Sequence, residues 1–194
     1  MKVTITLTEE MLGMTAGNPE IASEFQISRS ADAQKQAEEE AALSGTEIIE
    51  KSMTVFPKEN GIPFMWDYQI KGMFKDSCNM LYRVKTSESA KLKAYKKVID
   101  GLIFVTPRKI LMTIPEGMKM GTCQRALRGQ TAQGERIALA NSETVPLGTT
   151  FTFEVECLDK SLEKNVKEWL NYSARRGMGQ WRNSGKGRHD VVIS

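Results

Sequence analysis

A chain of 194 residues, 40% of them hydrophobic, is long enough for one large domain, or one domain with an insertion, and for a real core. Its three cysteines are odd in number and widely spaced, which argues against a disulfide framework and favours a reducing location. No segment approaches the roughly 20 apolar residues of a membrane span, and charges and threonines interrupt the N-terminus where a signal sequence needs an apolar core. We therefore expect a cytoplasmic protein without a membrane partner.

The net charge of +3 is divided unevenly along the chain. Residues 9–50 hold ten acids and two cations, a balance of −8, and Lys2 adds one positive charge, so residues 51–194 must carry +10. One interpretation is a cationic body that binds a polyanion, beside an acidic segment that does not. The other is an ordinary domain with a solvated acidic helix. Charge alone leaves both interpretations open.

The first elements follow from alternation and from turn signals. Hydrophobic residues alternate with threonines over residues 2–8 and predict a strand with one buried face. After a break at residues 17–19, residues 31–43 are rich in Ala, Glu and Gln and predict a surface helix. Residues 53–56 suggest a further strand, and Asn60-Gly61 is the strongest hairpin signal in the sequence.

The middle of the chain changes from helical spacing to strands. Hydrophobic residues three and four apart predict a half-buried helix from Pro63 to about Arg83. A short basic helix, or the start of one, is expected at residues 92–99, followed by strands at 102–105 and 109–114. Residues 119–140 have no strong period and carry several arginines and glycines, which predicts a long basic hairpin or loop.

The last part of the chain completes a familiar order of elements. Residues 149–157 predict a strand, Ser161 is expected to cap the helix that follows, and residues 190–193 predict a final strand. With an insertion at about 14–52 set aside, the order is close to βαββαβ. We therefore expect a single α+β domain over residues 1–194 with a ferredoxin-like (RRM-like) core. That fold presents an open antiparallel sheet, which several RNA-binding modules use.

Residues 175–188 are the most informative stretch of the sequence. They hold four glycines, five cations, one tryptophan and no acid. Glycine allows close backbone approach, Arg and Lys attract phosphate, and an aromatic face can stack on a base, so the stretch suggests contact with nucleic acid. A P-loop does not fit, because five residues separate Gly179 from Gly185 where that motif has four, and Lys186 is followed by glycine.

Catalytic and metal sites find little support. His189 is the only histidine and no two cysteines are near each other, whereas a zinc site needs about four clustered ligands. We therefore expect no metal, no cofactor and no enzymatic activity, and we interpret His189 as a surface residue of an edge strand. Trp169 is predicted to lie in the core and Trp66 to pack before a helix, while Trp181 either stacks on a base or packs in the core.

Three segments, in order, resemble the RAMP superfamily, whose members build the RNA-binding backbone of CRISPR effector complexes. Residues 61–75 resemble the family's proline–aromatic motif that leads to Leu-Lys-Gly, and residues 145–155 resemble its Gly-Thr entry to an alternating strand. Residues 177–188 resemble its C-terminal glycine-rich loop. Some positions depart from the pattern, among them Tyr68-Gln69 where the family usually has two serines. The chain is also similar to small proteins of phages and prophages.

The resemblance and the charge together imply a protein that binds the RNA backbone without cleaving it. No segment matches the acidic loop with which some family members cleave target RNA. The implied partners are RNA, including a guide RNA, or single-stranded DNA, together with CRISPR or other host defence proteins and further copies of the chain in a homo-oligomer or filament. The residues expected to contact nucleic acid are Lys71, Gly72, Lys75, Arg125, Arg128, Arg175, Arg176, Trp181, Arg182, Lys186 and Arg188.

Two alternatives stay open. For Lys71 and Gly72, the alternative is a helix packed tightly against the sheet. For the whole chain, the alternative is a phage counter-defence protein, similar in role to an anti-CRISPR protein, that binds a host defence complex in the host cytoplasm. Its binding surface would be the acidic segment from Glu9 to Glu50.

Overall fold

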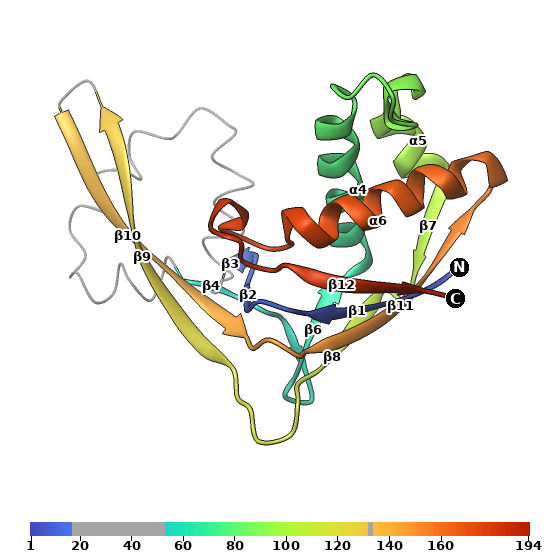
Figure 1. The fold of residues 1–194 in the computed structure, drawn as a ribbon. Coiled ribbons are helices and arrows are strands. Elements are labelled where there is room, and N and C mark those ends of the chain that lie inside the picture. The colour runs from blue at the N-terminus through green and yellow to red at the C-terminus, as the bar shows by residue number, and fades with distance from the viewer. Residues whose placement is uncertain (17–52, 132–133) are drawn as a thin grey trace, which may run out of the picture. The chain divides into compact units, whose positions relative to one another are not determined.

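The computed structural model describes residues 1–16, 53–131 and 134–194, which form an α+β fold as the sequence predicted (Figure 1). None of the described helices is both long enough and apolar enough to cross a membrane. The chain divides into two compact units. The first unit contains Met1–Met11, Pro57–Lys119 and Val145–Ser194, and the second contains Leu12–Phe56 and Met120–Thr144.

Part of the predicted organisation lies outside the described residues. This applies to the break at residues 17–19 and to the surface helix at residues 31–43. A single domain with an insertion at about 14–52 therefore stays a prediction.

A seven-stranded sheet forms the framework of the first unit. Its strands are β1 (Lys2–Leu7), β5 (Lys58–Glu59), β6 (Ile62–Trp66), β7 (Ile103–Thr106), β8 (Lys109–Thr113), β11 (Thr150–Cys157) and β12 (His189–Ile193). The antiparallel neighbours of β1 are β12 and β11. On its other side β11 pairs with β7 and β8 along different parts of its length, and β8 continues the sheet to β6 and β5.

Alternation along β1 gives this sheet one buried face. Val3, Ile5 and Leu7 are at most 2% exposed, which confirms the predicted strand. The residues between them point to the other face, where the hydroxyls of Thr4 and Thr152 lie 3.0 Å apart. Burying three aliphatic side chains on one short strand stabilises the fold by roughly 1.5–3 kcal/mol for each side chain.

Helices cover the buried face of the sheet (Figure 1). They are α4 (Asp67–Leu81), α5 (Tyr95–Leu102) and α6 (Glu163–Arg176), with short 3-10 turns η1 (Ser89–Lys91), η2 (Lys160–Leu162) and η3 (Arg182–Ser184). The rings of Phe74 and Trp169 join α4 to α6 with their centroids 5.7 Å apart. Trp169 is fully buried, as predicted, and its indole N–H donates to the hydroxyl of Ser89 at 2.8 Å.

The predicted hairpin turn at Asn60-Gly61 is confirmed. It joins β5 to β6, and both of its residues have positive φ, 52° and 82°, as a two-residue hairpin turn requires. The strands predicted at 102–105 and 109–114 are confirmed as β7 and β8, each within a residue of the predicted bounds.

The predicted start of the first core helix at Pro63 is wrong. Residues from Pro63 to Trp66 belong to β6, which pairs with β8, and α4 begins at Asp67. Hydrophobic residues at helical spacing begin at Ile70. The short apolar segment before them, residues 63–66, fits a buried strand as well as it fits a helix. The backbone N–H of Trp66 donates to Oε1 of Gln69 at 2.9 Å, which satisfies one of the donors at the helix start.

The predicted cap at Ser161 is also wrong. The carboxylate of Asp159 accepts a hydrogen bond from the backbone N–H of Ser161 at 2.8 Å, and the turn η2 precedes α6. The carboxylate of Asp159 therefore caps η2, and α6 begins at Glu163, one residue later than a cap at Ser161 predicts.

The second unit contains a smaller sheet. Its strands are β2 (Met11–Leu12), β3 (Thr15–Ala16), β4 (Thr54–Val55), β9 (Gly121–Thr131) and β10 (Gly134–Val145). They lie in the order β2-β10-β4-β3, and β9 pairs with β10. The pair β9–β10 is the long hairpin expected over residues 119–140, which settles the choice between a hairpin and a loop. The hydroxyl of Thr54 donates to that of Ser142 at 2.8 Å, where β4 runs parallel to β10.

Candidate nucleic-acid interface

The backbone conformation near the C-terminus depends on two glycines. We call residues 177–188 the C-terminal loop. Its two ends cross each other, and the N–H of Met178 donates to the carbonyl of Gly187 at 3.0 Å. A Cβ atom on Gly177 would collide with the carbonyl oxygen of Lys186, and one on Gly187 would collide with that of Met178. Both glycines also have positive φ, which other residues rarely adopt. The crossing therefore requires glycine for two reasons, the lack of space and the backbone conformation.

The segment that follows β1 holds the C-terminal loop in place. The N–H of Gly187 donates to the carbonyl of Glu10 at 2.8 Å, and the N–H of Thr8 donates to the carbonyl of Arg188 at 2.9 Å. The ammonium of Lys186 lies 2.6 Å from a carboxylate oxygen of Glu10. Met178 is buried beneath the loop. These contacts make the loop a fixed surface of the first unit.

His189 lies under the loop, not on the surface. The prediction of an exposed residue on an edge strand is wrong, because its side chain is only 2% exposed. Its Nδ1 lies 2.9 Å from the carbonyl oxygen of Gly187, to which it must donate, and its Nε2 lies 3.2 Å from the hydroxyl of Ser173 on α6. Burial lowers the pKa of His189, against smaller opposing effects of the Gly187 carbonyl and Asp190, and this favours the neutral imidazole.

Asp76 on α4 forms ion pairs with two of the predicted cations. The carboxylate of Asp76 lies 2.6 Å from the guanidinium of Arg182 and 3.7 Å from that of Arg176. Arg176 also donates to the side-chain oxygen of Asn183 at 2.8 Å. Asp76 is one helical turn after Gly72, so the structure brings α4 and the C-terminal loop together at this carboxylate.

The other cations predicted on α4 face a different neighbour. The ammonium of Lys75 lies 2.6 Å from the carboxylate of Asp100 on α5, and Lys71 donates to the backbone carbonyl of Asp100 at 3.3 Å. Lys71 also lies 5.2 Å from the centre of the Phe104 ring. Two of the predicted phosphate contacts thus line the seam between α4 and α5, separate from the arginines that Asp76 binds.

Gly72 has open space where a side chain would be. A Cβ atom placed on it would meet no atom within 4 Å, so the alternative of tight packing against the sheet is wrong for this residue. A glycine inside a helix costs about 1 kcal/mol relative to alanine. Packing within the described part of the chain does not account for that cost.

Three predicted residues of the loop region are exposed. Arg175 and Arg188 are exposed and form no ion pair with another described residue. Trp181 is 42% exposed and has a left-handed backbone with φ 55°, so core packing does not describe it. The guanidinium groups of Arg175 and Arg188 are therefore open to a ligand at the surface.

Two predicted cations lie in the second unit. Arg125 and Arg128 are on β9, where they pair in register with Ala140 and Ile137 of β10. The basic hairpin was therefore correctly located along the sequence. Contact of these arginines with nucleic acid stays a prediction.

The open face of the large sheet mixes polar side chains with apolar ones. Its exposed positions on β11 are Thr152, Glu154 and Glu156, and its neighbouring position on β1 is Thr4. RNA-recognition modules of this general form stack bases on aromatic side chains of the sheet. The positions paired with these residues include Phe104 of β7, opposite Glu156, and Val192 of β12, opposite Thr4, and both are exposed.

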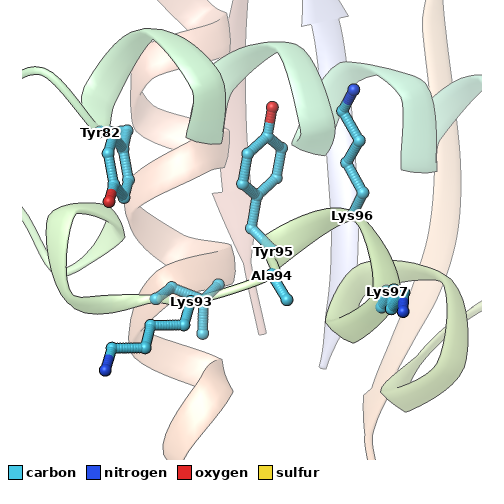
Figure 2. A pocket seen from close by; sticks show the side chains of 7 residues that line it. Tyr82, Lys93, Ala94, Tyr95, Lys96 and Lys97 are labelled. Carbon is cyan, nitrogen blue, oxygen red and sulfur yellow. The ribbon is translucent and has the colours of Figure 1, made fainter.

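A groove that was not predicted from the sequence lies at the start of α5. It has a volume of about 400 Å³ (Figure 2). Its lining residues, which define the tyrosine–lysine groove, are Tyr82, Leu92, Lys93, Ala94, Tyr95, Lys96 and Lys97. The signal that could have revealed it is a cluster of lysines around a tyrosine at residues 93–97, since basic residues interleaved with aromatics are typical of nucleic-acid contacts.

No arrangement for metal chemistry is visible in the described residues. Across residues 1–16, 53–131 and 134–194, no three His, Cys, Asp or Glu side chains group as metal ligands would. The thiols of Cys78 and Cys157 have pKa values raised chiefly by burial, which disfavours the reactive thiolate.

Comparison with known proteins relates the fold to CRISPR complexes. No family model and no curated protein matches the sequence. A chain of a type III-B Cmr-β complex bound to cognate target RNA is similar, with a TM-score of 0.60 and 12% identity over 99% of this chain. This chain spans 58% of the length of that chain.

Two other solved structures show weaker similarity. A chain of a type IV-B CRISPR complex has a TM-score of 0.47 and 13% identity over 100% of this chain and 89% of its own length. Cmr6 from Pyrococcus furiosus has a TM-score of 0.46 and 11% identity over 100% of this chain and 97% of its own length. The first of these similarities shows that this protein has a fold like that of one chain of a type III-B Cmr-β complex.

Proposed function

We propose that this protein binds the sugar–phosphate backbone of single-stranded RNA, without cleaving it, as a subunit of a CRISPR-like or phage ribonucleoprotein. The C-terminal loop carries the proposal. It is held rigidly by its crossed glycines, and the exposed Arg175, Arg188 and Trp181 belong to it or adjoin it. A rigid loop loses little conformational entropy on binding, so its cations can bind phosphate efficiently.

The fold supports the same proposal. Strands β12, β1, β11 and β7 are neighbours in that order, and α4 and α6 lie on one face. We propose that this part of the first unit is a ferredoxin-like core. The similar chain of the type III-B complex comes from an assembly solved with its target RNA.

The buried histidine supports binding without cleavage. His189 is the only histidine of the chain, and the loop covers it. A general acid or base must come within hydrogen-bond reach of the proton it transfers. His189 instead uses both ring nitrogens on Gly187 and Ser173, inside the protein. Its placement is that of a structural residue.

Charge removal at the exposed arginines tests the proposal. The double substitution Arg175→Gln and Arg188→Gln removes two phosphate contacts and leaves the ion pairs of Arg176, Arg182 and Lys186 intact. We expect weaker binding of single-stranded RNA, and a plot of log affinity against log salt concentration whose slope is reduced by about 1.4. Fluorescence anisotropy at several salt concentrations measures both quantities.

A matched control removes the same charge elsewhere. Lys2 and Lys160 are exposed and lie outside the C-terminal loop. Replacing both with Gln should leave the salt slope close to that of the parent. If the parent does not bind RNA, or if both double variants bind as the parent does, the proposed function is wrong.

A further inference from the structure

The tyrosine–lysine groove combines flat apolar walls with a cationic rim. Figure 2 shows the rings of Tyr82 and Tyr95 in the space between the end of α4 and the start of α5. Tyr82 is 52% exposed, while Tyr95 is partly buried and its hydroxyl donates to the side-chain oxygen of Asn79 at 3.2 Å. That hydrogen bond fixes one ring, and the other lies at the open side of the groove.

The lysines of the rim differ from most of the cations predicted from the sequence. Lys93, Lys96 and Lys97 are exposed, and none of them forms an ion pair with another residue that the structure describes. Lys75 and Arg182, in contrast, already contact carboxylates. A phosphate at the rim therefore displaces only water, whereas a phosphate at Lys75 or Arg182 must compete with an acid of the protein.

We propose that this groove binds one nucleotide of a single-stranded RNA, with the base against the tyrosine rings and the adjoining phosphates at Lys93, Lys96 and Lys97. The inference rests on the proposed function and adds a base-contacting site to it. An aromatic face next to an anion is the chemistry that the groove complements. An acidic peptide matches the rim alone, because it has no flat face for the rings.

The α4–α5 seam connects this groove to cations already expected to bind RNA. Lys71, Lys75 and Asn79 follow one another at four-residue spacing on one face of α4, and Tyr82 comes three residues later. Lys71 and Lys75 contact Asp100 of α5, and Asn79 contacts Tyr95 of the same helix. One strand of RNA along this seam would meet two cations before its base reaches the groove.

Substitution of Tyr82 tests the base contact. Tyr82→Leu removes the ring and keeps an apolar side chain, and Tyr82→Phe keeps the ring as the matched control. With a fluorescent oligoadenylate of about 16 nucleotides, we expect Tyr82→Leu to weaken binding roughly fivefold to a hundredfold and Tyr82→Phe to bind like the parent. Replacing the three rim lysines with Gln should reduce the salt slope by about 2.

An abasic oligonucleotide separates stacking from charge. The parent should bind abasic RNA more weakly than oligoadenylate of the same length, and this difference should be lost in Tyr82→Leu. If the parent binds both equally, the groove recognises anions alone and the inference is wrong. It is also wrong if Tyr82→Leu binds like the parent while the Arg175 and Arg188 double variant loses affinity, an outcome that leaves the proposed function standing.

A mononucleotide probe keeps the groove testable if the protein does not bind RNA. Adenosine 5′-monophosphate should shift the ring resonances of Tyr82 and Tyr95 in an NMR titration, and ribose 5-phosphate should not. Such shifts would support a nucleotide site even though the proposed function had failed. Equal shifts with both probes, or none with either, would overturn the site.

Discussion

At the scale of single residues, Gly72 stands out because nothing in the described fold requires a glycine there. The residue lies inside α4, its backbone is helical, and a Cβ atom would enter open space. Gly177 and Gly187 differ in this respect, since the crossing of the C-terminal loop demands them. The proposed function gives a reason for glycine at this position, because an RNA strand could approach the helix closely there.

Substitution of Gly72 by Ala separates an effect on helix stability from an effect on RNA binding. We expect Gly72→Ala to raise the free energy of unfolding by about 0.5–1 kcal/mol, because alanine loses less entropy in a helix, and to weaken RNA binding severalfold. Urea unfolding and fluorescence anisotropy give the two values.

Gly101→Ala is the matched control for this test. A Cβ atom at Gly101 also meets nothing within 4 Å, and the residue lies in α5. This variant should be stabilised in the same way without loss of RNA affinity. Equal affinities of the parent and both variants would show that RNA does not approach α4 at Gly72.

At the scale of elements, His189 joins three parts of the fold. It belongs to β12, contacts Ser173 of α6, and donates to the carbonyl of Gly187 in the C-terminal loop. Protonation of a buried imidazole places an uncompensated charge among these elements. The stability of the loop and its supports therefore depends on a neutral histidine.

This dependence predicts a loss of stability in acid. Because burial lowers the pKa of His189 in the folded protein, its contribution is complete above the ordinary histidine pKa of about 6.5 and is lost as the pH falls through the lower folded value. Urea unfolding at pH 7.5 and 5.5 should show the loss in the parent. His189→Asn can keep a donor near the Nδ1 position and does not titrate, so its decline should be smaller. An equal decline in both proteins would place the acid sensitivity elsewhere.

Helices, strands and turns were predictable from the sequence where the pattern of neighbouring residues determines them. The alternation in β1, the Asn60-Gly61 turn and the buried Trp169 depend on neighbours in sequence, and all three are confirmed. The boundary at Pro63 depends on pairing between β6 and β8, which are distant in the chain. The same limit applies to the site, because Asp76 and Asp100 become partners of the predicted cations only through helix packing.

At the scale of the whole molecule, repeated binding along one RNA is the expected organisation. The RAMP resemblance implies head-to-tail stacking, and heterologous contacts of that kind form open filaments. Backbone contacts of the proposed kind repeat along a strand, so they set no fixed number of copies on a long RNA. The number of copies bound should therefore follow the length of the RNA.

Light scattering checks this expectation directly. We expect a monomer without RNA and a mass that rises in steps of one protomer as single-stranded RNA is lengthened. The Arg175 and Arg188 double variant should remain a monomer with each RNA. A parent that stays monomeric both with and without RNA would contradict the assembly, although it would leave single-copy binding intact.

The crossed ends of the C-terminal loop have a consequence for tracing the ancestry of this protein. Gly177 and Gly187 are separated by nine residues, and each lies where the other strand leaves no space for a side chain. Drift in sequence can alter the charges between them but cannot replace either glycine without rebuilding the loop. Two glycines at this interval, after a helix and two residues before a histidine, give a search pattern for other sequences that form the same loop.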